Sequence, residues 1–487
     1  MTPADRTAFD PDRFRREAAA VADWIARYWE QLDTRPVSPH VEPGWVRAQL
    51  PEAPPETPEP LADVLADVER VIAPALVHWQ HPAFFAYFPA SASGPSILGE
   101  LLAAGLGVQG MLWSTSPACT ELETHVLEWL RLLLGLPDRF SPSGSGGGVI
   151  QDSASSGVLC AMLAARERAT ALGTNTAGLA AEGPQLVAYA SADAHSSIEK
   201  AAGIVGIGRS WLRRIPATSR GGMDPHALAG AMAQDAAAGR RPFFVAATVG
   251  TTASGSIDPV TEIAAVAGPH AAWLHVDAAW AGAAALCPEF RPPLVAGSEA
   301  ADSWGFNPHK WLCVNVDCHA LWVADRAAIV GALSMKPDYL WNAASASGGV
   351  TDYSDWQVPL GRRFRALKLW MTLRMLGAET LRRKIRDHVA WAEEFAGWVR
   401  QDERFEIIRE PSLSLVCFAL RAGDDATSTL LERVNRSGTA CLSHARIDGR
   451  LAIRLAVGGP TTTRQHVAAA WQAVNGAADS GRAGHPA

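Results

Sequence analysis

Residues 273–279 read WLHVDAA, an apolar run that ends in a carboxylate, and residues 307–311 read NPHKW. The pattern predicts that Asp277 and Lys310 lie at the ends of consecutive strands. An amine can hold the aldehyde of pyridoxal phosphate as a Schiff base, and a buried carboxylate keeps the ring nitrogen of that cofactor protonated. Taken alone, Lys310 would be a solvated surface charge and Asp277 a cap or turn residue. Together they predict a pyridoxal phosphate site.

Helical stretches alternate with short apolar runs between about residues 94 and 370, which predicts a mainly parallel α/β sheet covered by helices. The candidate strands are residues 186–190, 243–248, 272–276 and 320–323. Residues 370–376 and 381–398 have helical periodicity. Apolar strands at residues 415–420 and 451–455, followed by a final helix, predict a small C-terminal α/β domain.

The N-terminal part of the chain has a different pattern. Residues 13–32 place apolar side chains at helical intervals, which predicts an amphipathic helix. Residues 51–60 (PEAPPETPEP) form a stiff polar connector, because proline fixes φ and lacks a backbone donor, and a second helical stretch follows at 61–77. We therefore expect an N-terminal helical segment at 1–93, a large cofactor-binding domain at 94–370 and a small domain at 371–487; from the pattern alone, the first segment would pack on its own subunit.

Composition excludes several classes of protein. No uninterrupted apolar window long enough for a membrane span occurs, and the charged first residues do not suit a secretory leader. The net charge of −7 argues against a nucleic-acid partner. Seven scattered cysteines suit reduced thiols in the cytoplasm. No metal is expected, because neither grouping of candidate ligands forms a complete set. These groupings are His78 with His81, and Cys313 with Cys318 and His319.

Other segments extend the motif around the lysine and the acid. They read HPAFFAYFP at residues 81–89, SPACTELE at 116–123, VIQDSAS at 149–155, DAHSS at 193–197 and PLGRRFR at 359–365. With NPHKW, they resemble the group II pyridoxal-dependent amino acid decarboxylases, most closely the aromatic L-amino acid decarboxylases. The resemblance covers nearly the whole chain and implies the aspartate-aminotransferase-like architecture called fold type I. Any one of these motifs alone would be a weak signal.

The segment after residue 152 predicts an anion site at the start of a helix. Ser153, Ala154 and Ser155 precede a helical stretch from about 157 to 168, where free N–H groups and hydroxyls can meet a phosphate. The residues alone also permit an ordinary serine N-cap. The glycine run at 144–148 lacks the spacing of a dinucleotide fingerprint. The resemblance carries the phosphate role to these three residues, cofactor contacts to Thr252, Asn307 and His309, and ring stacking to His195.

The resemblance also implies a reaction. After carbon dioxide leaves the bound amino acid, the electrons flow into the cofactor ring, whose protonated nitrogen Asp277 stabilises. Tyr339 would then protonate the substrate from a loop whose Ala-, Ser- and Gly-rich part, residues 342–349, is expected to close as a lid. In relatives that form aldehydes, phenylalanine replaces the loop tyrosine or asparagine replaces the stacking histidine. Tyr339 and His195 therefore favour amine formation over aldehyde synthesis or transamination, and the intact set disfavours a non-catalytic scaffold.

The expected substrate is an aromatic L-amino acid, with a non-aromatic one as an alternative. Trp79, Tyr87 and Phe88 match the aromatic wall of the family's pocket, although such residues also suit a core. Gly348 leaves room for a wide ring, which favours an indole. Where the animal enzymes have a threonine, this chain has Ala90, so a hydroxyl available to a catechol is absent. Tryptophan, tyrosine, phenylalanine and DOPA all remain open.

The resemblance further implies a homodimer with shared active sites. In the family, the N-terminal helices lie across the partner subunit, which also contributes an isoleucine and a phenylalanine to the pocket. In this chain Gln109 and Met111 replace those two residues. Methionine is pliable, and a glutamine can accept a hydrogen bond from an indole N–H or a phenol. The pocket is therefore expected to differ from that of the animal enzymes.

Overall fold

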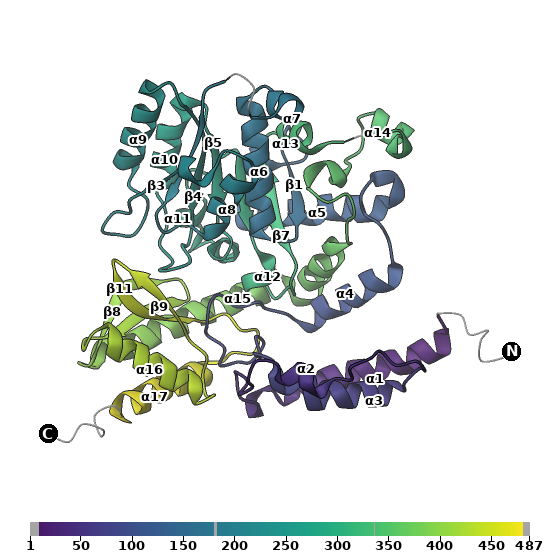
Figure 1. Cartoon of the computed structure of the whole chain (residues 1–487), viewed down its shortest axis with the longest axis vertical. Helices are drawn as coiled ribbons and strands as arrows, with labels where there is room; N and C mark the ends of the chain where they lie inside the picture. Colours follow the sequence, from purple (N-terminus) through teal and green to yellow (C-terminus); the bar gives the residue numbers. More distant parts are fainter. Residues whose placement is uncertain (1–8, 180–182, 336, 481–487) are drawn as a thin grey trace.

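The computed structural model describes residues 9–179, 183–335 and 337–480 of the chain. A seven-stranded sheet lies at its centre, in the order β1-β7-β6-β5-β4-β2-β3 (Figure 1). The strands are β1 (Gly147–Gln151), β2 (Leu186–Ser191), β3 (Leu212–Ile215), β4 (Arg241–Thr248), β5 (Trp273–Asp277), β6 (Ser303–Phe306) and β7 (His319–Val323). Neighbours from β3 to β6 are parallel, whereas β7 is antiparallel to both β6 and β1. The predicted mainly parallel sheet is confirmed.

The strands of this sheet that the sequence predicts are continuous apolar runs. β2, β4, β5 and β7 coincide with the predicted apolar runs, and nearly all of their residues are buried. The sequence pattern does not predict the other three strands of this sheet. β1 begins with two glycines, β3 contains two arginines, and β6 has only four residues, so none of them has a clear period.

Helices cover both faces of this sheet and enclose two separate hydrophobic cores. One face is covered by α6 (Ala154–Ala169), with α8 (Ser196–Ile204) and α13 (Arg326–Leu333) beside it. The other face is covered by α5 (Pro117–Leu134), α9 (Pro225–Ala237) and α10 (Val260–Ala267). Because both faces are covered, ligands can reach the sheet only at the ends of its strands.

A second, four-stranded antiparallel sheet of order β10-β11-β9-β8 forms the C-terminal part of the chain. It comprises β8 (Phe405–Ser412), β9 (Leu415–Leu420), β10 (Ser443–Ile447) and β11 (Arg450–Ala456), with α16 (Asp424–Arg436) and α17 (Arg464–Ser480) packed nearby. The long α15 (Arg365–Gln401) connects it to the first sheet and has non-helical backbone angles at Gly377. The two helices predicted on either side of this glycine are confirmed, and they join at the kink.

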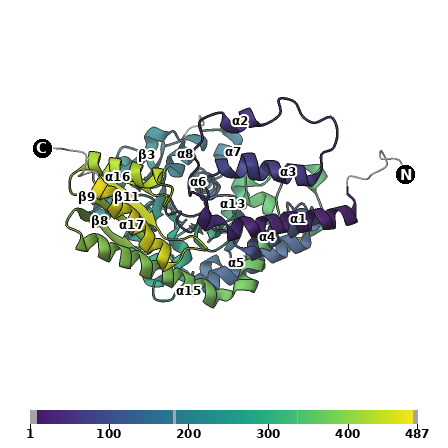
Figure 2. The ribbon, with the colours of Figure 1, turned by 90° about the horizontal axis from the view of Figure 1, so that it is seen from below.

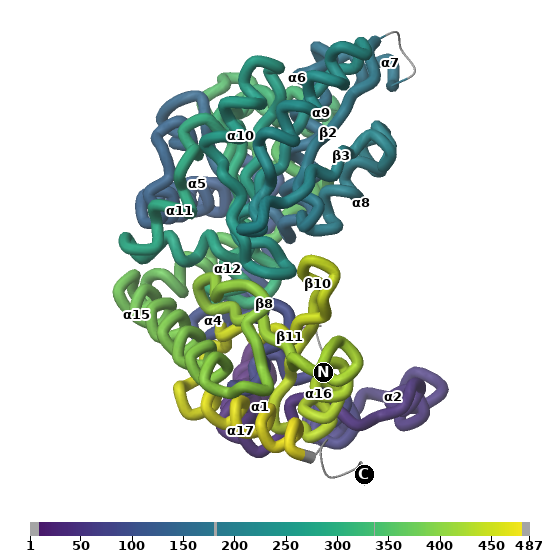
Figure 3. Tube along the Cα trace, turned by 90° about the vertical axis from the view of Figure 1, so that its left-hand side faces the viewer, coloured from purple at the N-terminus to yellow at the C-terminus, as the bar shows by residue number. Residues whose placement is uncertain are grey.

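The N-terminal helices lie at one end of the molecule, away from the central sheet, as Figures 1 and 2 show. They are α1 (Pro11–Glu30), α2 (Trp45–Gln49) and α3 (Leu61–Asp67), the last of which continues in π and 3₁₀ turns to Ala75. In a side view, α2 projects from the body of the molecule (Figure 3). No residue of α1 is buried, although the amphipathic pattern that predicted this helix is present.

α4 (Gly94–Leu106) follows these helices and packs against α15. In the described part of the chain, no helix combines the length and the apolar character needed to span a membrane.

Candidate active site

Lys310 lies in α12 (Pro308–Trp311), a single turn that follows β6. Asn307 begins this turn: its N–H donates to the carbonyl of Ala279 (2.9 Å), and its own carbonyl accepts from the N–H of Lys310 (3.0 Å). These bonds tie the lysine to the turn after β5, where Asp277 is the last strand residue. The prediction that the acid and the lysine follow neighbouring strands is confirmed.

The Lys310 amine lies in an apolar setting beside an aromatic ring. Its Nζ atom is 5.4 Å from the centroid of Phe88. Burial lowers the pKa of Lys310; Asp277 opposes this shift and Arg454 adds to it. A lowered pKa increases the neutral fraction of the amine, which is the form that attacks an aldehyde.

Asp277 and Lys310 both interact electrostatically with His195. The Asp277 side chain is 7% exposed and accepts a hydrogen bond from the N–H of Ala279 (3.0 Å). Burial lowers the pKa of His195, while Asp277 raises it and Lys310 lowers it further. His195 Nδ1 accepts from the N–H of Ser197 (3.2 Å), so the neutral ring carries its proton on Nε2. The structure therefore brings three of the predicted residues together.

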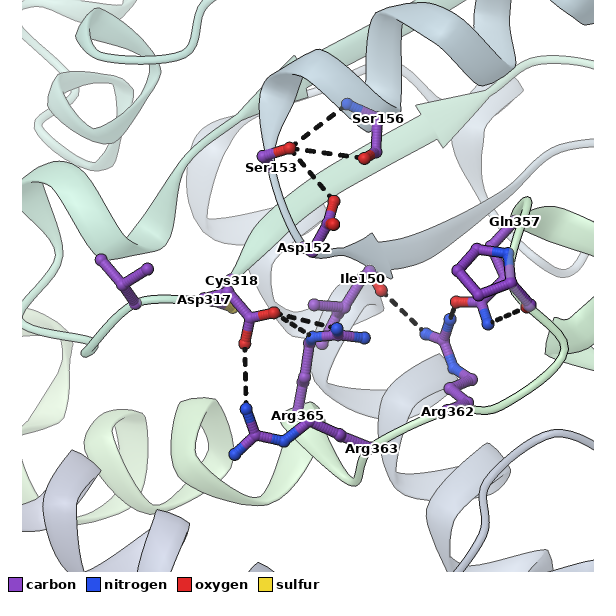
Figure 4. A network of polar contacts seen from close by, with 12 residues as sticks. Ile150, Asp152, Ser153, Ser156, Asp317, Cys318, Gln357, Arg362, Arg363 and Arg365 are labelled. Atoms are coloured by element: carbon purple, nitrogen blue, oxygen red, sulfur yellow. Dashed lines mark hydrogen bonds and ion pairs between the residues drawn. The ribbon is translucent and has the colours of Figure 1, made fainter. Parts of the chain in front are cut away.

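The start of α6 is capped by Ser153, whose hydroxyl also donates to the carboxylate of Asp152 (3.1 Å; Figure 4). β1 leads through Asp152 into Ser153, whose Oγ accepts from the N–H of Ser156 and caps the helix (3.3 Å). The N–H groups of Ala154 and Ser155 lie in the first turn, where a helix supplies no acceptor of its own. A phosphate is the kind of ligand that such a helix start binds.

Two further residues predicted to contact the cofactor lie in turns at the strand ends. His309 Nδ1 accepts from the N–H of Cys318 (2.9 Å), which leaves Nε2 as the donor of the neutral ring. Burial lowers the pKa of His309 to about 4, and Lys310 lowers it as well. Thr252 is exposed in the turn after β4, next to Thr251, which is buried.

The segment of residues 79–91 places the aromatic wall between the two sheets. Phe85 pairs with the C-terminal sheet region through backbone bonds to Cys441 (2.9 Å) and Ala456 (3.0 Å). The N–H of Ser91 donates to the carbonyl of His309 (3.0 Å), which brings the other end of the segment to the lysine turn.

Within this segment, Trp79 and Tyr87 stack on each other with ring centroids 5.6 Å apart, and both remain exposed. Phe88 is buried and stacks on Trp280 at 4.3 Å. The carbonyl of Ala90 accepts a hydrogen bond from the Gln80 side chain. Of the predicted aromatic wall, the structure therefore brings Phe88 to Lys310.

Tyr339, Gly348, Gln109 and Met111 are among the predicted residues that have no bond or ring contact with Lys310, Asp277 or His195 in the described part of the chain. Tyr339 is 77% exposed in the short turn Asp338–Leu340, and Gly348 is exposed with φ of +70°. The side-chain oxygen of Gln109 accepts from the N–H of Arg362, and the carbonyl of Met111 accepts from the N–H of Ser354.

Arg454 is a site residue that the sequence reasoning missed. It is only 3% exposed, and its Cζ atom is 5.0 Å from the centroid of Phe88. Nη1 donates to the carbonyl of Tyr87 (3.2 Å) and to Ser443 Oγ (2.9 Å), and Nε donates to Ala253 (3.1 Å).

Among the described residues, no carboxylate forms an ion pair with Arg454, and Nη2 has no hydrogen-bond partner. A buried cation of this kind calls for an anionic partner. Its signal in the sequence is a charge within the apolar strand β11 (RLAIRLA).

Comparison with known proteins agrees with this geometry. Residues 43–421 match the family model described as pyridoxal-dependent decarboxylase conserved domain. The chain is 44% identical to the aromatic-L-amino-acid decarboxylase of Mus musculus, over 97% of this chain and 98% of the mouse protein. It is 43% identical to a phenylacetaldehyde synthase of Arabidopsis thaliana, over 96% of each chain.

Two solved structures extend the comparison to the fold. Oryza sativa TDC with PLP and tryptamine has a TM-score of 0.94 at 39% identity, covering 98% of this chain and 99% of that chain. Catharanthus roseus tryptophan decarboxylase in complex with L-tryptophan has a TM-score of 0.91 at 39% identity, covering 98% and 100%. These likenesses support the fold type I architecture.

The residues of this chain fit pyridoxal phosphate. The half-buried Lys310 amine suits the aldehyde, the Asp277 carboxylate suits a protonated ring nitrogen, and the start of α6 suits the phosphate. The neutral ring of His195 interacts electrostatically with Lys310 and Asp277. The chain belongs to the pyridoxal-dependent decarboxylase family.

Proposed function

We propose that the protein removes the carboxyl group of an aromatic L-amino acid as carbon dioxide and releases the corresponding amine. The observation that carries this proposal is that Asp277 and His195 both interact electrostatically with Lys310, whose amine lies beside the ring of Phe88. The mouse and plant relatives named above as decarboxylases of aromatic amino acids support the substrate class.

Each residue at the strand ends has a proposed task. Lys310 holds the cofactor covalently, and Asp277 keeps a proton on the ring nitrogen. Ser153, Ala154 and Ser155 bind the phosphate with Thr252, Asn307 and His309, while the neutral ring of His195 lies against the cofactor ring. When bound, pyridoxal phosphate accepts the electron pair that carbon dioxide leaves behind.

The substrate would be oriented by one charge and one aromatic surface. Arg454 offers its unpaired Nη2 to the α-carboxylate, and a charge-assisted bond of this kind is directional. Phe88, Tyr87 and Trp79 provide ring faces for the aromatic side chain, which stacking favours by about 1 kcal/mol. Ala90 and Gly348 leave space where a larger residue would narrow the pocket.

The proton that completes the amine is assigned to Tyr339. Its side chain is exposed on the loop, so the loop must close before the phenol can reach the substrate. Closure would also exclude water from the carbon that receives the proton. The loop therefore acts after the substrate has bound.

A homodimer is the second part of the proposal. In the single chain, large apolar side chains are exposed on α1, α3 and α4, namely Phe14, Val64, Leu98, Leu101, Leu102 and Leu106. An apolar surface of this extent is typical of a subunit interface. We assign Gln109 and Met111 to the partner subunit's pocket, so that dilution into monomers would stop turnover.

A cytoplasmic location agrees with seven cysteines that form no disulfide.

The test is a substrate panel of L-tryptophan, L-tyrosine, L-phenylalanine, L-DOPA, L-histidine and L-glutamate, with pyridoxal phosphate and with Lys310→Ala as the control. Amine and carbon dioxide should form from the aromatic substrates and not with the variant. Activity on histidine or glutamate alone would contradict the aromatic assignment.

Aldehyde synthesis is the second candidate, because relatives include the Arabidopsis phenylacetaldehyde synthase and a Rhodiola rosea 4-hydroxyphenylacetaldehyde synthase at 40% identity. His195 and Tyr339 favour the amine. Aldehyde and hydrogen peroxide in place of the amine would decide for the synthase.

A further inference from the structure

His319 is a buried histidine for which the proposed mechanism has no task. It is the first residue of β7, and its side chain is 2% exposed. Across the antiparallel pair with β1 it lies opposite Gln151, two residues before the α6 cap Ser153. In Figure 4, the chain enters β7 through Asp317 and Cys318 while β1 leads into Ser153 nearby.

The imidazole occupies a space that two glycines leave open. A methyl group at Gly157, in the first turn of α6, would collide with Nε2 of His319. A methyl group at Gly305, in β6, would lie 2.8 Å from both Nε2 and Cε1. The ring is therefore packed between the start of the phosphate-binding helix and the strand that leads to the lysine turn.

His319 is also bonded to the first residue of that turn. Its Nδ1 lies 2.6 Å from Oδ1 of Asn307. Burial lowers the pKa of His319 well below its ordinary value, so the ring is neutral and Nδ1–H is the donor. Because the amide oxygen of Asn307 is held by this bond, its Nδ2 group must point away from His319.

Nε2 has no hydrogen-bond partner among the described residues. An apolar side chain of similar size would fill this space without a buried nitrogen that has no hydrogen-bond partner, and such an unpaired nitrogen lowers stability. Among the described residues, the side-chain hydrogen bond of the imidazole is the one to Asn307, and the backbone of Phe306 also interacts with the ring.

We propose that His319 is a positioning residue for the cofactor phosphate, holding the first turn of α6 and the amide of Asn307 in one arrangement around that anion. This inference rests on the proposed function, in which Asn307 and the α6 start bind the phosphate. His319 itself does not touch the cofactor; it decides which end of the Asn307 amide faces the phosphate.

The test compares pyridoxal phosphate with pyridoxal, which has the same aldehyde and lacks the phosphate. The apoprotein is titrated with each compound, and the dissociation constant is read from the yellow absorbance of the lysine-bound form. His319→Leu should weaken pyridoxal phosphate binding about tenfold, the equivalent of one hydrogen bond, and leave pyridoxal within about twofold. His319→Asn retains a nitrogen donor near the position of Nδ1 and should remain close to the wild type.

His275→Leu is the matched control, because His275 is equally buried and bonds Ser303 rather than Asn307 (2.8 Å). It should leave the ratio of the two dissociation constants unchanged. Equal weakening of both compounds by His319→Leu, or no weakening of either, would overturn the positioning role.

Asn307→Ala is a second test variant, which removes the amide and keeps the imidazole of His319. It must show the same selective loss of pyridoxal phosphate binding, and equal weakening of both compounds would again count against the inference. A wild-type protein that never develops the yellow absorbance, or develops it equally in Lys310→Ala, would instead contradict the proposed function itself.

Discussion

The strand ends around Lys310 and the loop around Tyr339 are built in opposite ways. Asp277, Asn307 and His309 are buried and held by backbone hydrogen bonds, whereas Tyr339 and Trp341 are 77% and 73% exposed. The difference teaches that the groups proposed to hold the cofactor are preorganised by the sheet, while the group proposed for the last proton transfer is carried on an exposed segment. Four predictions test this division.

The largest effect is expected from Asp277→Asn, which retains the shape of the side chain and removes its charge. Turnover should fall about a thousandfold or more, because the ring nitrogen loses the anion that stabilises its proton. The measurement is kcat with the preferred substrate, alongside the bound cofactor content. Turnover within tenfold of the wild type at full occupancy would remove Asp277 from its role.

Tyr339→Phe tests the mobile side of the comparison. Amine formation should fall about a hundredfold, which is the usual contribution of a positioned acid. Cofactor affinity and thermal stability should remain unchanged, because the side chain is exposed and forms none of the hydrogen bonds that support the strand ends. A drop in melting temperature similar to that of a core variant would show that the loop is structural.

We expect acid to destabilise the folded protein through the buried histidines near the strand ends. Burial lowers the pKa of His275 and of His309 to about 4, so both rings stay neutral in the folded protein. In the unfolded chain the same two histidines take up protons once the pH falls below the ordinary histidine pKa of about 6.5. Stability is therefore full above about pH 6.5 and is lost as the pH falls toward 4, by roughly 3 kcal/mol for each histidine.

The measurement is the thermal unfolding midpoint across this pH range. His275→Leu, which cannot be protonated, should lose less stability on acidification than the wild type. An identical pH slope in the two proteins would contradict the assignment.

Arg454→Met gives the smallest expected effect and sharpens the substrate side of the site. We expect KM to rise about tenfold with a smaller change in kcat, because a charge-assisted bond to the carboxylate is lost. Arg454→Lys keeps the charge and should recover part of the affinity. An unchanged KM in the methionine variant would exclude the carboxylate as the partner of Nη2.

Local patterns in the sequence were sufficient for much of the fold and the site. Apolar runs bounded by polar turns predict β2, β4, β5 and β7, because strands buried on both faces have little polar content. The Ser153 cap is a local motif as well, since its hydroxyl bonds a backbone group three residues away. Sequence resemblance adds the roles of Lys310, Asp277 and His195.

What remained hidden depends on pairings between distant segments. β1 is a glycine-rich strand that exists because β7 lies beside it, and no residue of α1 is buried although the helix is amphipathic. Arg454 meets Tyr87 across 367 residues. Thus the sequence by itself determined four strands of the central sheet, the family and the chemical groups, whereas only the tertiary structure placed Arg454 beside Phe88 and His319 beside Asn307, because burial and hydrogen-bond partners arise from long-range packing.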